Sequence, residues 1–187
     1  MSKLTLHVLM LLVPFILARG ADTRLDFQLT VSPQVWTIQH DDNVALPVLI
    51  LWKVLNKSSD VVILPTDTYA AIELVDANGK RILGGWGKDS ASDHPSHEFR
   101  VIQPKLSSFV LGGFDLNIFS KNNAIIVRGD ATDGSWLELG PLAAGTYKLR
   151  CTFSATNDPD LDKGHILGDK IWVGQYVSEW IEIIVKR

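Results

Sequence analysis

Alternation of apolar and polar residues is the dominant pattern in the chain. Residues 25–31 alternate strictly, with apolar side chains at the odd positions, and a period of two predicts a strand that buries one face. No stretch of ten or more residues has the period of a helix. Further strands are predicted at residues 35–38, which would continue the first strand, and at 44–56, 61–64, 69–75, 80–83, 99–102, 107–111, 116–119, 124–128, 136–139, 145–153 and 176–185. The chain is therefore predicted to be all-β.

Turn-forming residues separate two pairs of these strands. The polar residues 57–60 follow the strand at 44–56 and indicate a hairpin with residues 61–64. The dipeptide Asn78-Gly79 tolerates the left-handed backbone of a tight turn, and it indicates a second hairpin between the strands on either side of it.

Two segments have neither the period of a strand nor that of a helix. Residues 84–97 are rich in glycine, serine and aspartate and predict a long exposed loop, and residues 154–170 predict a second loop. Many short strands separated by turns are typical of an immunoglobulin-like β-sandwich of two antiparallel sheets. A barrel built from the same strands is the alternative.

The N-terminus has the three parts of a secretory signal. A lysine near the start precedes an apolar run at residues 8–17, and small residues follow at Ala18 and Gly20. The apolar run is too short to span a bilayer, because a spanning helix needs about 20 residues. We expect a signal peptide at residues 1–20, a single domain at residues 21–187, no membrane span after cleavage, and a secreted or periplasmic location.

Composition and charge narrow the class of protein. The chain has 187 residues, of which 46% are hydrophobic and 21% charged, and such a composition is typical of one globular domain with its own core. The formal net charge of −3 provides no basic surface that would attract a phosphate backbone. Nucleic acid is therefore not an expected partner.

Cys151 is the single cysteine of the chain, so no disulfide can form within it. It alternates with the apolar residues Tyr147, Leu149 and Phe153 along one predicted strand. A reactive thiol needs a lowered pKa and some exposure, which an apolar strand face does not provide. We expect a buried structural thiol.

Two parts of the chain resemble known families. The segments PLAAGTYKLR (141–150) and VGQYVSEWIEIIV (173–185) resemble the last two strands of bacterial exported immunoglobulin-like domains. The segments LNKSSDVVIL (55–64) and IELVDANG (72–79) are similar to the opening hairpin of BsuPI-type proteinase inhibitor domains. The resemblance implies an immunoglobulin-like fold and, through the second family, a peptidase-inhibitor role. No inhibitory loop matches residue by residue, and a fold alone does not specify a function.

Two clusters of residues are candidates for metal ligands. Carboxylates at alternate positions, followed by a later acidic residue, suggest a calcium loop formed by Asp158, Asp160, Asp162 and Asp169. Lys163 stands where such loops have glycine, which favours a solvated loop instead. His94 and His97 suggest a transition-metal site, but a serine-rich loop provides no rigid support for the rings. No cofactor is expected.

Catalytic motifs are missing, and aromatic residues point to binding instead. The sequence has neither a Gly-x-Ser-x-Gly nor a His-Glu-x-x-His motif, so we expect no enzyme. Among the six tryptophans, Trp52 and Trp136 are expected in the core. Trp86, flanked by glycines, is expected to be exposed and to contact a partner, together with His94 and His97.

The resulting prediction is an exported, non-catalytic binding or accessory protein. Its partner would be a protein or a glycan, contacted through loops or a strand edge. A peptidase inhibitor and a carbohydrate-binding module are the alternatives. Asn56-Lys-Ser58 has the form of an N-glycosylation site, but so short a motif is interpreted as a chance match.

Overall fold

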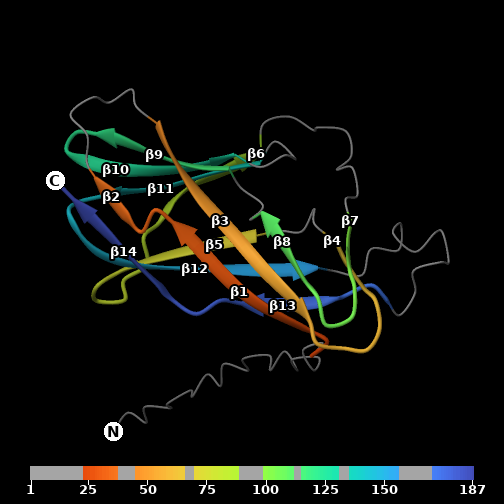
Figure 1. Ribbon diagram of the computed structural model, residues 1–187. Coiled ribbons are helices and arrows are strands. Elements are labelled where there is room, and N and C mark those ends of the chain that lie inside the picture. Colours follow the sequence, from red (N-terminus) through yellow and green to blue (C-terminus); the bar gives the residue numbers. More distant parts are fainter. Residues whose placement is uncertain are drawn as a thin grey trace, which may run out of the picture.

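The computed structural model describes residues 23–37, 45–65, 70–88, 99–111, 115–130, 135–155 and 170–187. Every regular element in these ranges is a strand, so the prediction of an all-β chain is confirmed. The strands form two large sheets and one small ribbon (Figure 1). Within the same ranges there is no helix of the length and apolarity that crossing a membrane requires.

The larger sheet is built around β3. Its strands are β1 (Leu25–Ser32), β3 (Ala45–Asn56), β6 (Gly84–Lys88), β8 (Ser107–Leu111), β9 (Asp115–Lys121), β10 (Ala124–Asp130) and β11 (Ser135–Leu142). Their order is β1-β3-β9-β10-β11-β6, and β8 also pairs with β3. One edge of β3 is therefore occupied by β1 and the other by β8 and β9. Strand β6 lies at the end of the sheet.

The smaller sheet is built around β12. Its strands are β2 (Val35–Thr37), β5 (Ala70–Asp76), β12 (Gly145–Ala155), β13 (Gly174–Val177) and β14 (Ile181–Lys186). Strand β5 pairs with one edge of β12, and β13 and β14 follow each other along the opposite edge. Strand β2 pairs with β14 in parallel, and the other pairs in this sheet are antiparallel. Strands β4 (Val62–Pro65) and β7 (Phe99–Ile102) form a separate ribbon at one end of the molecule (Figure 1).

The two sheets pack against each other through one hydrophobic core. Alternate residues of β12 face inward, as predicted: Tyr147, Leu149, Cys151 and Phe153 are all buried. Side chains of the larger sheet face them, and the rings of Phe27 and Phe153 lie 5.4 Å apart. Aromatic side chains fill one part of this core, namely Phe27, Trp52, Phe153, Trp172 and Tyr176. The expected core position of Trp52, which has no exposed surface, is confirmed.

Two of the predicted strand pairings are wrong. Residues 61–64 do not form a hairpin with 44–56, because both edges of β3 are already occupied; β4 pairs with β7 instead. Residues 35–38 do not continue the first strand. The chain changes sheets after β1, and β2 joins β14 in the smaller sheet.

The predicted turn at Asn78-Gly79 is present. The Asp76 carboxylate accepts hydrogen bonds from the backbone N–H groups of Asn78 and Lys80, each at 2.9 Å. Gly79 has a φ of +79°, which glycine adopts without steric cost. The returning segment forms a single bridge, between Val75 and Arg81, rather than a full strand.

Asn56 organises the turn between β3 and β4. Its side-chain Nδ2 donates to the carbonyl oxygens of Asp60 (2.7 Å) and Ile102 (3.0 Å), while its Oδ1 accepts from the N–H and the hydroxyl of Ser58. The residue has no exposed surface. A buried amide with these partners is not accessible for glycosylation, which agrees with a chance match to the N-glycosylation motif.

Replacing Asn56 with alanine is expected to lower the free energy of unfolding by about 1–3 kcal/mol, because buried carbonyl groups lose their hydrogen-bond donor. Urea denaturation of the purified protein measures this change. Asn78→Ala is the matched control, since Asn78 is exposed and substitutions at such sites usually change stability by less than about 0.5 kcal/mol. Equal effects of the two substitutions would contradict the proposed role of Asn56.

Candidate functional site

Most of the residues predicted to bind a ligand or metal lie outside the described ranges. This applies to His94, His97, Asp158, Asp160, Asp162 and Asp169, and indeed to all five histidines of the chain. Where the structure describes the chain, no group of three or more His, Cys, Asp or Glu side chains is placed to hold a metal. The two proposed metal sites therefore remain predictions.

Trp86 is exposed, as predicted, but it is not in a loop. Residues 84–88 form strand β6, so the prediction of a loop over 84–97 is wrong for its first five residues. The Trp86 side chain is 68% exposed. It pairs directly with Leu137 of β11, and directly opposed residues point to the same face of a sheet. Because Leu137 packs against the core, Trp86 points to the core-facing side of the larger sheet. It remains exposed because β6 is the last strand of that sheet.

Trp136 lies on the opposite, outer face of the larger sheet, and its predicted core position is wrong. It pairs with Gly87 of β6. A Cβ atom on Gly87 would be 2.6 Å from its indole ring, and a Cβ atom on Gly85 would be 3.1 Å from it. The ring therefore extends over β6 in the space that these two glycines leave free. Trp136 is only half-buried, so part of the ring faces solvent.

A shallow depression of about 390 Å³ lies on the same outer face, across β9, β10 and β11. It is lined by Phe119, Ser120, Lys121, Ile126, Arg128 and Glu138. The strand register explains this grouping, because Ile126 is directly opposite Phe119, and Arg128 is directly opposite Glu138. The volume lies within the range of about 300–1,000 Å³ that is typical of ligand sites.

A bulge between β10 and β11 borders the depression. The register changes by one residue between Ile125 and Val127, next to Gly140, which has a φ of +127°. Only glycine adopts such a backbone readily. Bulges reorient neighbouring side chains and are frequent beside functional sites. Here the bulge lies opposite Ile126, which lines the depression.

Both signs of charge occur around the depression. Lys121 and Arg128 are cationic, while Glu138 and the nearby, directly opposed Asp130 and Asp115 are anionic. The Nε of Arg128 lies 3.4 Å from Oδ1 of Asp130, and the two side chains are 50% and 57% exposed. Exposed ion pairs contribute at most about 1 kcal/mol to stability, so these side chains are not needed to hold the fold and can turn towards a ligand.

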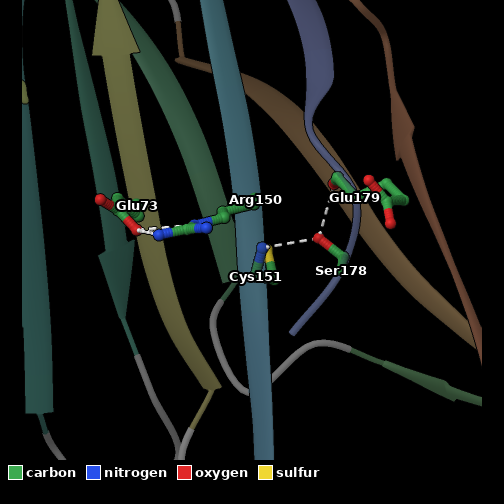
Figure 2. A network of polar contacts seen from close by, with 5 residues as sticks. All are labelled: Glu73, Arg150, Cys151, Ser178 and Glu179. Atoms are coloured by element: carbon green, nitrogen blue, oxygen red, sulfur yellow. Dashed lines mark hydrogen bonds and ion pairs between the residues drawn. The ribbon is translucent and has the colours of Figure 1, made fainter. Parts of the chain in front are cut away.

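The outer face of the smaller sheet has a different character, because its charged and aromatic groups contact one another; Figure 2 shows the contact between Arg150 and Glu73. Nη2 and Nε of Arg150 lie 2.6 Å and 2.7 Å from the same carboxylate oxygen of Glu73. The guanidinium carbon of Arg150 also lies 4.4 Å from the ring centre of Trp180. These contacts connect β5, β12 and the segment before β14, so we assign them a structural role.

Ser178 pairs with Cys151 at a bulge, and Figure 2 shows the hydrogen bonds of the serine hydroxyl. The three residues between β13 and β14 face two residues of β12. The N–H of Ser178 donates to the carbonyl of Cys151 (2.9 Å), and the N–H of Cys151 donates to the Ser178 hydroxyl (3.0 Å). That hydroxyl donates in turn to the carbonyl of Glu179. The serine side chain thus completes the backbone pairing and is not positioned as a nucleophile.

The Cys151 thiol is likewise structural. The residue is buried, as predicted, and burial raises the pKa of its thiol to about 12. The thiolate is the reactive form of cysteine. At neutral pH the group is therefore an apolar core side chain.

No protein-family model matches this chain, and no curated protein or solved structure is significantly similar to it. The outer face of the larger sheet is therefore assigned as the candidate site from its own geometry. Sequence reasoning missed Phe119, Arg128 and Glu138 because they occupy polar-side positions of ordinary strands. The alternation of Gly85 and Gly87 could have indicated the outer position of Trp136, because two such glycines leave room on one face of a strand for a neighbouring aromatic ring.

Cys151 is expected to make the stability of the protein depend on pH above about 9. The unfolded thiol ionises near its ordinary pKa of about 8.5, whereas the folded thiol stays protonated up to about 12. The unfolded state therefore releases its proton first, and the free energy of unfolding falls as the pH rises through this window. Burial also raises the pKa values of Tyr147 and Tyr176, so Cys151→Ala should reduce this fall without abolishing it.

Chemical denaturation at a series of pH values measures this dependence for both proteins, and identical pH profiles would contradict the assignment. The native thiol should also resist a disulfide reagent at pH 8 and react only after unfolding.

Proposed function

We propose that this chain is an exported immunoglobulin-like β-sandwich domain that binds a ligand on the outer face of its larger sheet and catalyses no reaction. The depression lined by Phe119, Ile126, Arg128 and Glu138 is the observation that carries this proposal. Its lining combines the apolar side chains of Phe119 and Ile126 with a few polar groups, which is the usual composition of a binding site.

Two features support the immunoglobulin-like class. The central strands of the smaller sheet have the order β5-β12-β14, which corresponds to the C-F-G order of such domains. The hydroxyl of Tyr147, near the start of β12, donates to the carbonyl of Ala143 (2.9 Å), as in the tyrosine corner of that class. The antiparallel series β9-β10-β11 beside β3 is a departure from the usual A-B-E-D sheet.

Export is proposed from the sequence of residues 1–20, which lie outside the described ranges. The absence of a catalytic role is proposed from the residues most able to act as nucleophiles. Cys151 is buried with a raised pKa, and the hydroxyl of Ser178 is occupied by backbone groups. Both residues are therefore explained by the fold.

A protein partner at the edge of β6 is a second candidate. Strand β6 ends the larger sheet, and its register with β11 is unbroken from Gly84 to Lys88. Proline and charged side chains, lysine above all, protect sheet edges from further pairing; β6 has no proline, and its one charged residue is Lys88 at its end. An extended peptide could add to such an edge. The inhibitor alternative depends on loops outside the described residues.

The mature protein is expected to begin at Ala21. Expression with the full N-terminus in a bacterial host, followed by intact-mass measurement of the protein recovered outside the cytoplasm, tests this expectation. The measured mass should equal that of residues 21–187. Recovery of the uncleaved chain from the cytoplasm would contradict the proposed export.

A photo-cross-linking amino acid in place of Lys121 is expected to capture the natural ligand in the cells that produce the protein, because residue 121 is exposed and lines the depression. Lys148 is the matched control position, since it is exposed on the other sheet. An adduct at residue 121 and none at residue 148 is the expected result. Capture at residue 86 alone would favour the β6 edge, and capture at none of these positions would contradict the proposed binding surface.

A further inference from the structure

We infer that the outer face of β9, β10, β11 and β6 binds a neutral glycan chain, with Trp136 and Phe119 as two separate stacking platforms. This inference rests on the proposed function and names the ligand class for the same surface. Three observations support it: the placement of the two aromatic rings, the polar groups between them, and the lack of an excess of cations among the described residues of this face.

The glycines of β6 make Trp136 a suitable platform. Gly85 and Gly87 leave space that the indole ring occupies, so the ring packs against the backbone of β6. The ring remains only half-buried. Sugar rings have an apolar face of C–H groups, and such faces stack on the flat surface of an aromatic ring. A supported ring loses little side-chain freedom on binding, which favours affinity.

Phe119 provides the second apolar contact. Together with the directly opposed Ile126, it forms the apolar part of the depression. The register places this pair four residues along β10 from the pair formed by Asp130 and Trp136. The two platforms are thus separated by roughly 13 Å along the strands and by roughly 10 Å across them. One sugar ring cannot cover both platforms, so the surface fits a chain of several rings.

Polar side chains lie between the two platforms. Arg128 and Glu138 are directly opposed across β10 and β11 and occupy this interval. A guanidinium group presents paired donors and a carboxylate presents paired acceptors, and neighbouring hydroxyl groups of a sugar can pair with either. Arg128 keeps half of its side chain exposed, so these hydrogen bonds require little rearrangement of the protein.

The charges favour a neutral chain over an anionic one. The cations Lys121 and Arg128 share this face with three carboxylates, those of Asp115, Asp130 and Glu138. The Arg128–Asp130 contact already pairs two of these groups. An anionic polymer would meet repulsion from the carboxylates, and it would need an excess of cations that this face does not have. The ring of Trp180 on the other sheet is a poorer platform, because Arg150 already lies over it.

Titration calorimetry of the mature protein with neutral oligosaccharides tests the inference. The panel consists of cello-, xylo-, malto- and chito-oligosaccharides of graded length. At least one series should bind, and its affinity should increase with length until both platforms are covered. Trp136→Ala should lower the affinity by about ten-fold or more. Trp136→Phe should lower it less, because a ring remains over the two glycines.

Trp86→Ala is the matched control for the platform. Trp86 is the more exposed tryptophan of the same sheet edge, but it points to the opposite face, so the affinity should change by less than about two-fold. Arg128→Gln should weaken binding, whereas Lys148→Gln on the other sheet should not. Denaturation midpoints of all variants establish that each is folded. Equal effects of the Trp136 and Trp86 substitutions would overturn the inference.

Three other results would also overturn it: no binding to any member of the panel, affinity that falls steeply with salt, or self-association of the protein through this face. Cross-linking at residue 121 separates these failures from failure of the proposed function. An adduct that contains only protein would leave the binding surface in place and exclude the glycan, whereas no adduct would remove both.

Discussion

The contact between the two sheets depends on a cluster of aromatic side chains. The ring of Phe27 lies within 5.0–5.4 Å of the rings of Tyr176, Trp172 and Phe153, and these residues come from both sheets and from the segment before β13. With a single cysteine, the chain has no internal disulfide to join the sheets, so packing alone does so. Each aromatic pair adds about 0.5–1.5 kcal/mol beyond the burial of its surface.

In the described residues, the indole N–H groups of Trp52 and Trp172 lack a hydrogen-bond partner. Leaving such groups unpaired costs about 1–3 kcal/mol each, and the burial of several large rings together outweighs that cost.

Because the inner faces of the strands supply the core, the outer faces are free for other roles. Along β9 and β10, the residues that alternate with Phe119 and Ile126 are the buried ones, among them Ile118, Ile125 and Val127. Phe119 and Ile126 therefore contribute little to the contact between the sheets. Phe119 and Ile126 form an apolar pair on this outer face, beside charged residues of both signs and a bulge. The proposed ligand site rests on this grouping, whereas the charged and aromatic groups of the smaller sheet contact each other.

The sequence predicts the strands well because alternation is a local property. It places Cys151 on the correct face and Trp52 in the core. Strand pairing is not local: the turn after β3 suggested a hairpin, but β1, β8 and β9 occupy both edges of that strand. Strand β6 escaped prediction because glycine has a low strand propensity, and the segment is a strand because it pairs with β11 and supports Trp136. The outer position of Trp136 was missed because apolar Leu137 follows it directly, so that its segment lacks the strict alternation that distinguishes the two faces.

The glycines of β6 also fix which tryptophan lies on the outer face of the larger sheet. A shift of one residue in the pairing of β6 with β11 would exchange the two faces of β6 and bring Trp86 to the side on which Trp136 lies. The indole of Trp136 leaves no space for this, since even a Cβ atom at Gly87 would come within 2.6 Å of it. Gly84 imposes a second constraint, because a Cβ atom there would be 1.6 Å from the carbonyl oxygen of Glu138. The register of β6 with β11 gives Trp136 its support, and the separate register of β10 with β11 holds Glu138 opposite Arg128. Strand β11 takes part in both pairings, so it positions the platform relative to the polar groups of the proposed site.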